Sequence, residues 1–225
     1  KKYRKMSSQT PLFKKIDASA FNFSKVQKRA YNLDVLRQTL TLDFLHQKID
    51  FKQIDRTIVI GDGFGTMTTL LLENNFSNQI FLVNLRKTLL ADLLYIKMVI
   101  GDKRFEEEIV LIDDIKQLSK IEDKHKIIAI EAENYNLLSE IQKDLVLNIA
   151  SFQEMDLGVI NLYFKYLYKQ KNKPFYFYLC NREEKFLPDG SLIRIKDYPF
   201  FENDKILVDE LCPWHQDFYT FKPPF

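Results

Sequence analysis

The sequence lacks the features that identify membrane-spanning and nucleic-acid-binding proteins. No apolar run reaches the roughly 18 residues that a transmembrane helix requires, so we expect no membrane span. The formal net charge is only +2, which gives no basic footprint for nucleic acid, and we expect no nucleic-acid partner. With 46% hydrophobic and 28% charged residues, the chain can bury one sizeable core.

Cysteine is scarce as well. Cys180 and Cys212 are the two in the chain, and their spacing is that of neither a metal-ligand motif nor a redox motif. We therefore expect free thiols, no metal site and a reducing compartment. No signal peptide is recognisable, which favours a cytoplasmic location.

Glycine is also rare, but three of the six glycines fall at alternate positions in Gly61-Asp62-Gly63-Phe64-Gly65. The β-branched run at 57–60 leads into them, which predicts a strand, a tight turn and then a helix. A dinucleotide fingerprint has glycine at its first, third and sixth positions, and the sixth position here is Thr66. Glycine at the first, third and fifth positions is typical of S-adenosylmethionine (SAM) enzymes. We therefore expect residues 61–65 to bind this cofactor.

Strands and helices alternate after the turn. Apolar runs predict strands at 79–84, 109–112, 127–130, 145–150 and 175–179, with a helix at about 87–100 and another around Ile160, Tyr163, Phe164 and Leu167. This alternation predicts a Rossmann-like α/β fold, whose mostly parallel sheet has helices on both faces.

The two ends of the chain predict appended segments. A helical apolar pattern from Val26 to Phe44 predicts a helical N-terminal cover over residues 1–50. Residues 51–225 are expected to form the Rossmann-like domain. Beyond Arg182, short segments rich in proline, aspartate and aromatics predict an antiparallel edge hairpin and a covering loop.

In open α/β sheets, ligands lie beyond the carboxyl ends of the strands. Asn84 follows the second strand, where an acid usually accepts from both ribose hydroxyls; asparagine can accept one bond and donate another. Glu131 and Ala132 stand where an adenine ring is expected. Asn148 and Ser151 are candidates to bond the cofactor or the acceptor, although a strand-end asparagine often only closes a turn.

Several of these segments resemble a known family, the putative sugar O-methyltransferases among the class I SAM-dependent methyltransferases. The resemblance covers roughly residues 25–225. It is carried by Ile60-Gly61-Asp62-Gly63-Phe64-Gly65, Asp144-Leu145-Val146-Leu147-Asn148-Ile149-Ala150-Ser151-Phe152-Gln153-Glu154-Met155, Tyr163-Phe164, Asn181-Arg182 and Cys212-Pro213-Trp214-His215-Gln216.

The resemblance implies SAM as cofactor and transfer of a methyl group to a sugar hydroxyl. The acceptor would be a polysaccharide, a lipid-linked sugar or a nucleotide sugar. The chain departs from the family pattern at Val59, where such enzymes often carry an acid, and at Asn84, where the ribose-binding residue is usually Asp.

A poorly acidic sugar hydroxyl needs a proton acceptor. His215 is the first candidate and Glu154 the rival. Each also has a structural interpretation, His215 as a surface neighbour of a buried tryptophan and Glu154 as an acid at the start of a helix.

The acceptor sugar has candidate ligands of its own. Asn181 and Arg182 are suited to a hydroxyl-rich or phosphorylated acceptor, although Arg182 can equally pair with a nearby glutamate. Trp214 either stacks on a sugar ring or anchors the tail to the core. Two other functions stay open, namely methyl transfer to another small molecule or to RNA, and a degenerate SAM fold that serves as a binding or assembly partner.

Overall fold

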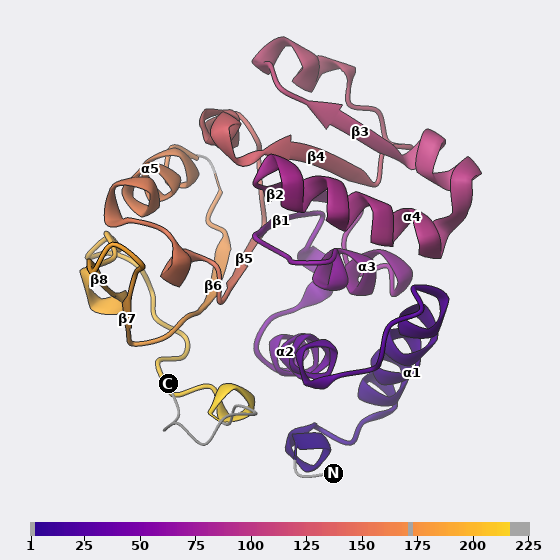
Figure 1. Cartoon of the computed structure of the whole chain (residues 1–225). Coiled ribbons are helices and arrows are strands. Elements are labelled where there is room, and N and C mark those ends of the chain that lie inside the picture. The colour runs from indigo at the N-terminus through magenta and orange to yellow at the C-terminus, as the bar shows by residue number, and fades with distance from the viewer. Residues whose placement is uncertain (1–2, 171–172, 217–225) are drawn as a thin grey trace.

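A computed structural model describes residues 3–170 and 173–216 (Figure 1). Its α-helices are α1 (Pro11–Val26), α2 (Leu33–Lys48), α3 (Thr66–Glu73), α4 (Arg86–Glu108) and α5 (Leu157–Leu167). Its strands are β1 (Arg56–Ile60), β2 (Gln79–Asn84), β3 (Ile109–Ile112), β4 (Ile127–Glu131), β5 (Leu145–Ile149), β6 (Tyr176–Cys180), β7 (Glu184–Phe186) and β8 (Leu192–Arg194). Short 3-10 helices are η1 (Tyr3–Met6), η2 (Phe51–Gln53), η3 (Ile115–Lys120), η4 (Ala132–Ser139), η5 (Phe152–Glu154), η6 (Ile195–Asp197) and η7 (Pro213–His215).

The main sheet has six parallel strands in the order β3-β4-β2-β1-β5-β6. This arrangement confirms the expected α/β fold class. After β1 the chain forms β2 beside it and β3 at the edge of the sheet, comes back between these two as β4, and then crosses to the other side of β1 as β5. The boundary between β1 and β5 is therefore the topological switch point, at which ligands bind in such sheets.

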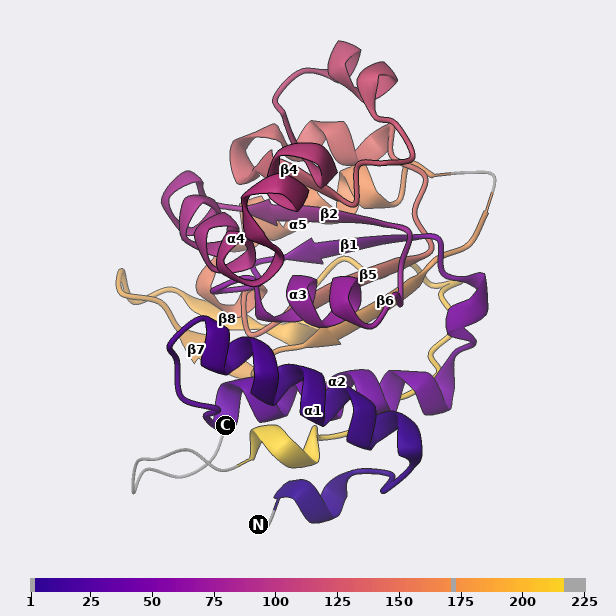
Figure 2. The same ribbon diagram turned by 90° about the vertical axis from the view of Figure 1, so that its right-hand side faces the viewer.

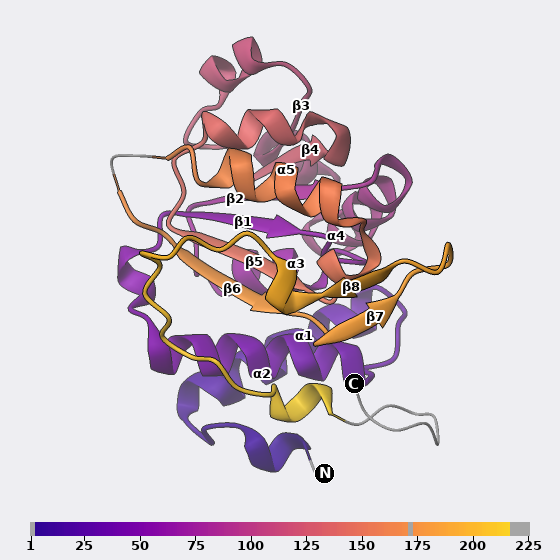
Figure 3. The same cartoon turned by 90° about the vertical axis from the view of Figure 1, so that its left-hand side faces the viewer.

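The antiparallel pair lies apart from the main sheet. β7 and β8 pair with each other as a separate two-stranded sheet instead of extending the edge of the parallel one (Figure 3). The covering loop expected after this hairpin runs on into residues 217–225, which lie outside the described residues.

Alternate strand residues face opposite layers, as the period of a pleated strand requires. Val59, Leu82 and Leu147 point into one core together with α3 and α4, which face the viewer in Figure 2. Ile58 and Val146 point into a second core with η4 and α5, on the side seen in Figure 3. Both faces of the sheet are therefore covered, which explains why its strands are apolar without a break.

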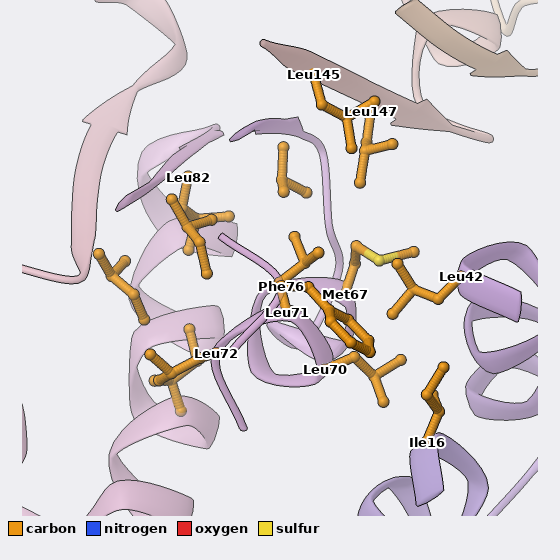
Figure 4. Close-up of a cluster of buried hydrophobic side chains, with 14 of the residues drawn as sticks. Ile16, Leu42, Met67, Leu70, Leu71, Leu72, Phe76, Leu82, Leu145 and Leu147 are labelled. Atoms are coloured by element: carbon orange, nitrogen blue, oxygen red, sulfur yellow. The ribbon is translucent and has the colours of Figure 1, made fainter. Parts of the chain in front are cut away.

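The N-terminal helices belong to the first of these cores. Ile16 on α1 and Leu42 on α2 pack with Met67, Leu70 and Leu147 (Figure 4). The cover expected at residues 1–50 thus shares its apolar core with the sheet.

The expected N-terminal helix is in fact two helices. Val26 ends α1, and α2 begins only at Leu33, where the side-chain oxygen of Asn32 accepts from the amide of Val35 at 3.0 Å. An asparagine in this position caps a new helix instead of continuing an old one. The helix expected at 87–100 also differs, because α4 continues to Glu108 after a kink at Gly101, whose φ is 80°. None of the described helices has the length and apolar character needed to cross a membrane.

We expect Leu42→Ala to lower the free energy of unfolding by about 2–5 kcal/mol, because it leaves a cavity between α2 and the sheet. The Leu42 side chain is 0% exposed. Leu90→Ala on α4, where the side chain is 63% exposed, is the matched control and should change stability little. Urea denaturation followed by circular dichroism measures both, and two separate unfolding transitions would contradict a shared core.

Candidate functional site

The glycine turn joins β1 to α3 through backbone that glycine favours. Gly61, Gly63 and Gly65 have φ values of 73°, 65° and 61°. A Cβ on Gly61 would lie 2.0 Å from Ser151 Oγ, and one on Gly65 would lie 2.8 Å from Ile96. A Cβ on Gly63 would meet nothing within 4 Å among the described residues. Gly61 and Gly65 are therefore required for packing, whereas Gly63 presents bare main chain to open space.

Carboxylate side chains accept hydrogen bonds from the backbone amides at the start of α3. Asp62 accepts from the amides of Met67 and Thr68 at 2.8 and 2.7 Å. Asp92, from α4, accepts from the amide of Gly65 at 2.9 Å. A helix N-terminus is a ready anion site, and in dinucleotide-binding folds the pyrophosphate uses it. Here the protein's own acids fill that site.

The two acids are buried close to one another. Burial raises the pKa of Asp62. Burial, and then the neighbouring charge of Asp62, raise the pKa of Asp92 to about 7, although hydrogen bonds from Asn84 and Gly65 oppose the shift. The turn therefore presents carboxyl oxygens whose ionised form is disfavoured by burial and by their mutual repulsion, so a positive charge nearby would stabilise it.

Asn84 belongs to the same network. Its amide donates to Asp92 Oδ2 at 2.8 Å and its oxygen accepts from the amide of Leu85 at 2.9 Å, and the residue is 9% exposed. Both ends of the side chain are thus engaged with protein atoms. The sequence alone did not identify Asp92 as a member of this network. Its position on the buried face of an otherwise apolar helix is the signal that could have done so.

A small cavity of about 10 Å³ lies where β1 ends, which is room for about one water molecule. Gln38 reaches it from α2, and its Oε1 is buried with no hydrogen-bond partner among the described residues. The cavity is lined by Gln38, Val59, Ile60, Gly61, Asp62, Met67, Leu147 and Ile149. Gln38, whose side-chain oxygen is orphaned, therefore lines the same cavity as the first glycine of the turn.

A second polar network joins the ends of β5 and β6. Asn148 donates to the carbonyl of Ile60 at 3.2 Å and accepts from the Phe152 amide at 3.1 Å and from Asn181 Nδ2 at 2.9 Å. The Asn181 oxygen accepts from the amide of Gln153 at 3.0 Å. Asn148 and Asn181 thus fix the loops at the carboxyl edge, next to Ser151 and Gly61.

Gln153 extends this network to Arg182. Its side-chain oxygen accepts from the Arg182 amide at 2.8 Å. Burial lowers the pKa of the Arg182 guanidinium, while the nearby charge of Glu154 opposes that shift.

Glu154 lies at the surface, with its side chain 54% exposed and ion-paired with Lys185. Burial raises its pKa, but hydrogen bonds from Lys185 and Gln153 outweigh this and leave the pKa below the ordinary value.

Glu131, at the end of β4, pairs with Arg86 at 3.3 Å and stands beside Asn84 in the sheet register. Ala132 follows directly as the first residue of η4. The predicted adenosine-side residues are therefore adjacent at one edge of the sheet.

Trp214 anchors the tail to α2. Its ring is 6% exposed, donates from Nε1 to Thr41 Oγ1 at 3.2 Å and packs edge-on against Phe44. The Trp214 carbonyl accepts from Arg37 Nε at 2.9 Å. The sequence left two roles open for Trp214, namely stacking on a sugar ring and anchoring the tail, and these contacts are those of an anchor.

His215 lies next to this anchor. Burial, and then the charge of Arg37, lower the pKa of His215 to about 4, so the ring is neutral at pH 7. Its neighbours also include the two cysteines, which the fold brings together although their sequence spacing gave no sign of it. The two candidate bases therefore have different surroundings, Glu154 beside Lys185 and His215 beside Arg37 and the thiols.

No protein-family model, no curated protein sequence and no solved structure matches this chain.

We expect Asp92→Asn to gain stability relative to the parent as the pH rises from 5 to 7.5. The pKa of Asp92 lies near 3.8 in the unfolded chain and at about 7 in the folded one, so the folded carboxyl holds a proton that the unfolded one has lost. This costs the parent up to about 1.4 kcal/mol per pH unit over that window, and the cost levels off above pH 7. The amide does not titrate.

Urea unfolding of both proteins at several pH values is the measurement. Groups that do not interact with residue 92 are the same in the two proteins, so their contributions to the pH dependence cancel in the difference. A difference in stability that stays constant between pH 5 and 7.5 would show that Asp92 does not retain its proton.

Proposed function

We propose that the protein is a SAM-dependent O-methyltransferase that acts on a sugar hydroxyl. The observation that carries the proposal is the chemistry of the glycine turn. Asp62 and Asp92 take the helix amides that a phosphate would need, and Gln38, which has an orphaned acceptor, lines the same cavity as Gly61. Such a turn disfavours the pyrophosphate of a dinucleotide and favours a cofactor with positive charge and donor groups. SAM carries both a sulfonium and an ammonium group.

The residues present suit such a cofactor. Gly61 and Gly63 would lie against it, and Gln38 Oε1 would accept a bond from its ammonium group. Glu131 and Ala132 would lie on the adenosine side with Asn84. Bound SAM would supply an activated methyl group. Because the cavity at Gly61 holds about one water molecule, we propose that binding moves α2 away from the turn.

The acceptor would bind near the ends of β5 and β6. Asn148 and Asn181 hold this edge rigid, while Arg182 and Glu154 lie beyond it. We propose Glu154 as the proton acceptor, because it is the more exposed of the two candidate bases. His215 is the rival; the pKa of each group is lowered, so basicity does not separate the two and exposure is the argument for Glu154. The free thiols favour a reducing compartment, and we place the reaction in the cytoplasm.

Two observations favour a second function. The Asn84 side chain is hydrogen-bonded at both ends to protein atoms, and the cavity lined by Gly61 is small. A degenerate fold that binds a partner and no cofactor would share both features.

We expect Gly63→Val to weaken SAM binding by at least about tenfold, because the side chain would fill the open space at bare main chain. Gly190→Val is the matched control. Gly190, in the β7–β8 hairpin, also has positive φ and nothing within 4 Å of a Cβ among the described residues, so it carries similar backbone strain. Isothermal titration calorimetry with SAM, S-adenosylhomocysteine and NAD measures the affinities.

Binding of SAM by the parent that is lost in Gly63→Val but kept in Gly190→Val supports the cofactor site. Preference of the parent for NAD would contradict it. A parent that binds none of the three would favour the degenerate fold.

We expect Glu154→Gln to lower turnover by about 10² to 10⁴ while leaving SAM affinity nearly unchanged, because the amide cannot accept the proton. Glu140→Gln, an exposed acid that follows η4, is the control. Transfer of labelled methyl from SAM to a panel of glycans and nucleotide sugars measures turnover. Full turnover in Glu154→Gln would remove this residue from the mechanism.

A further inference from the structure

Three potential metal ligands meet near the carboxyl edge of the sheet. Cys180 is the last residue of β6, Cys212 caps η7 and His215 ends it. The two sulfurs and one ring nitrogen of His215 all lie within 4.8 Å of one another. None of these side chains has a part in the cofactor site proposed above, and His215 enters the proposed reaction only as the rival base.

The backbone holds the three ligands in place. The Cys180 carbonyl accepts from the amide of Ala150 at 2.8 Å, which fixes the end of β6. Cys212 and His215 are three residues apart in one 3-10 turn, which brings their side chains to the same side of the turn. The Cys212 carbonyl accepts from the His215 amide at 3.0 Å, and buried Trp214 anchors the turn. The convergence therefore depends on ordered elements.

The protonation states also suit a metal. His215 Nε2 is buried and makes no hydrogen bond to any described residue, and burial keeps the ring neutral by lowering its pKa. A hydrogen bond from Cys212 lowers the pKa of Cys180, with further help from Tyr178 and Arg37. The same bond, together with burial, raises the pKa of Cys212. A metal would displace the thiol protons on binding. Neutral imidazole and thiolate are the forms that bind transition metals.

We propose that Cys180, Cys212 and His215 bind one Zn²⁺ ion, with the fourth position open to water or to another ligand. Zn–S bonds of about 2.3 Å in a tetrahedral site place two sulfurs about 3.8 Å apart, so small side-chain rotations suffice. Two thiolates neutralise the ion, which leaves no net charge beside Arg37. Soft sulfur ligands select zinc over magnesium or calcium. The ion would fasten the C-terminal tail to β6.

Cobalt(II) titration of the full chain, reduced and freed of metal with a chelator, tests the proposal. We expect one cobalt per chain, a thiolate-to-cobalt charge-transfer absorption in the near ultraviolet, and its loss on adding zinc. Zinc should also protect both thiols from a thiol reagent. A parent protein without this absorption, or with thiols as reactive with zinc as without it, would overturn the proposal.

Single variants assign the ligands. Cys180→Ser, Cys212→Ser and His215→Gln should each weaken zinc binding by at least about 100-fold, because loss of a ligand exceeds the 10- to 100-fold effect of changing an outer partner. His125→Gln, in the loop before β4, is the control and should bind like the parent. Unchanged affinity in the three ligand variants would overturn the site. A disulfide in protein isolated without reductant, together with no cobalt binding after reduction, would show a redox pair instead.

Discussion

Two buried carboxylates at the start of α3 determine what the rest of the site can do. Asp62 and Asp92 satisfy helix amides that would otherwise need water or a ligand. Their positions join β1, α3 and α4 in one turn, and Asp92 also ties down Asn84 at the end of β2. The cost is two acids out of water, which raises the pKa of both. A ligand with positive charge would offset that cost, whereas a phosphate would add to it.

Much of the fold was predictable from the sequence, because strand periodicity and glycine placement are local signals. The unbroken apolar strands require a sheet covered on both faces, and the run into Gly61 requires a strand followed by a turn. The break between α1 and α2 was missed because apolar spacing continues across it. Only Asn32, read as a helix cap, would have indicated the new start.

The site was less predictable, because its hydrogen bonds join residues that are distant in the sequence and become neighbours only in the folded chain. Sequence position placed Asn84 at a strand end correctly, but its partner Asp92 comes from the middle of the next helix. The cluster around Cys180 was hidden for a stronger reason. Its members come from a strand and from the tail, and only the anchoring of Trp214 on α2 brings them together.

Helix α2 contacts both the cavity at the glycine turn and the C-terminal tail. Gln38 faces the cavity at Gly61, while its neighbour Arg37 and Thr41, one turn further along, hold Trp214. Because an α-helix moves as a rigid body over such a short span, any displacement that opened the cavity would also move the anchor of the tail. If a ligand at the glycine turn displaced α2 as proposed, it would therefore also change the position of His215. A metal ion between β6 and the tail would oppose that displacement, since it would fix the tail to the sheet independently of α2.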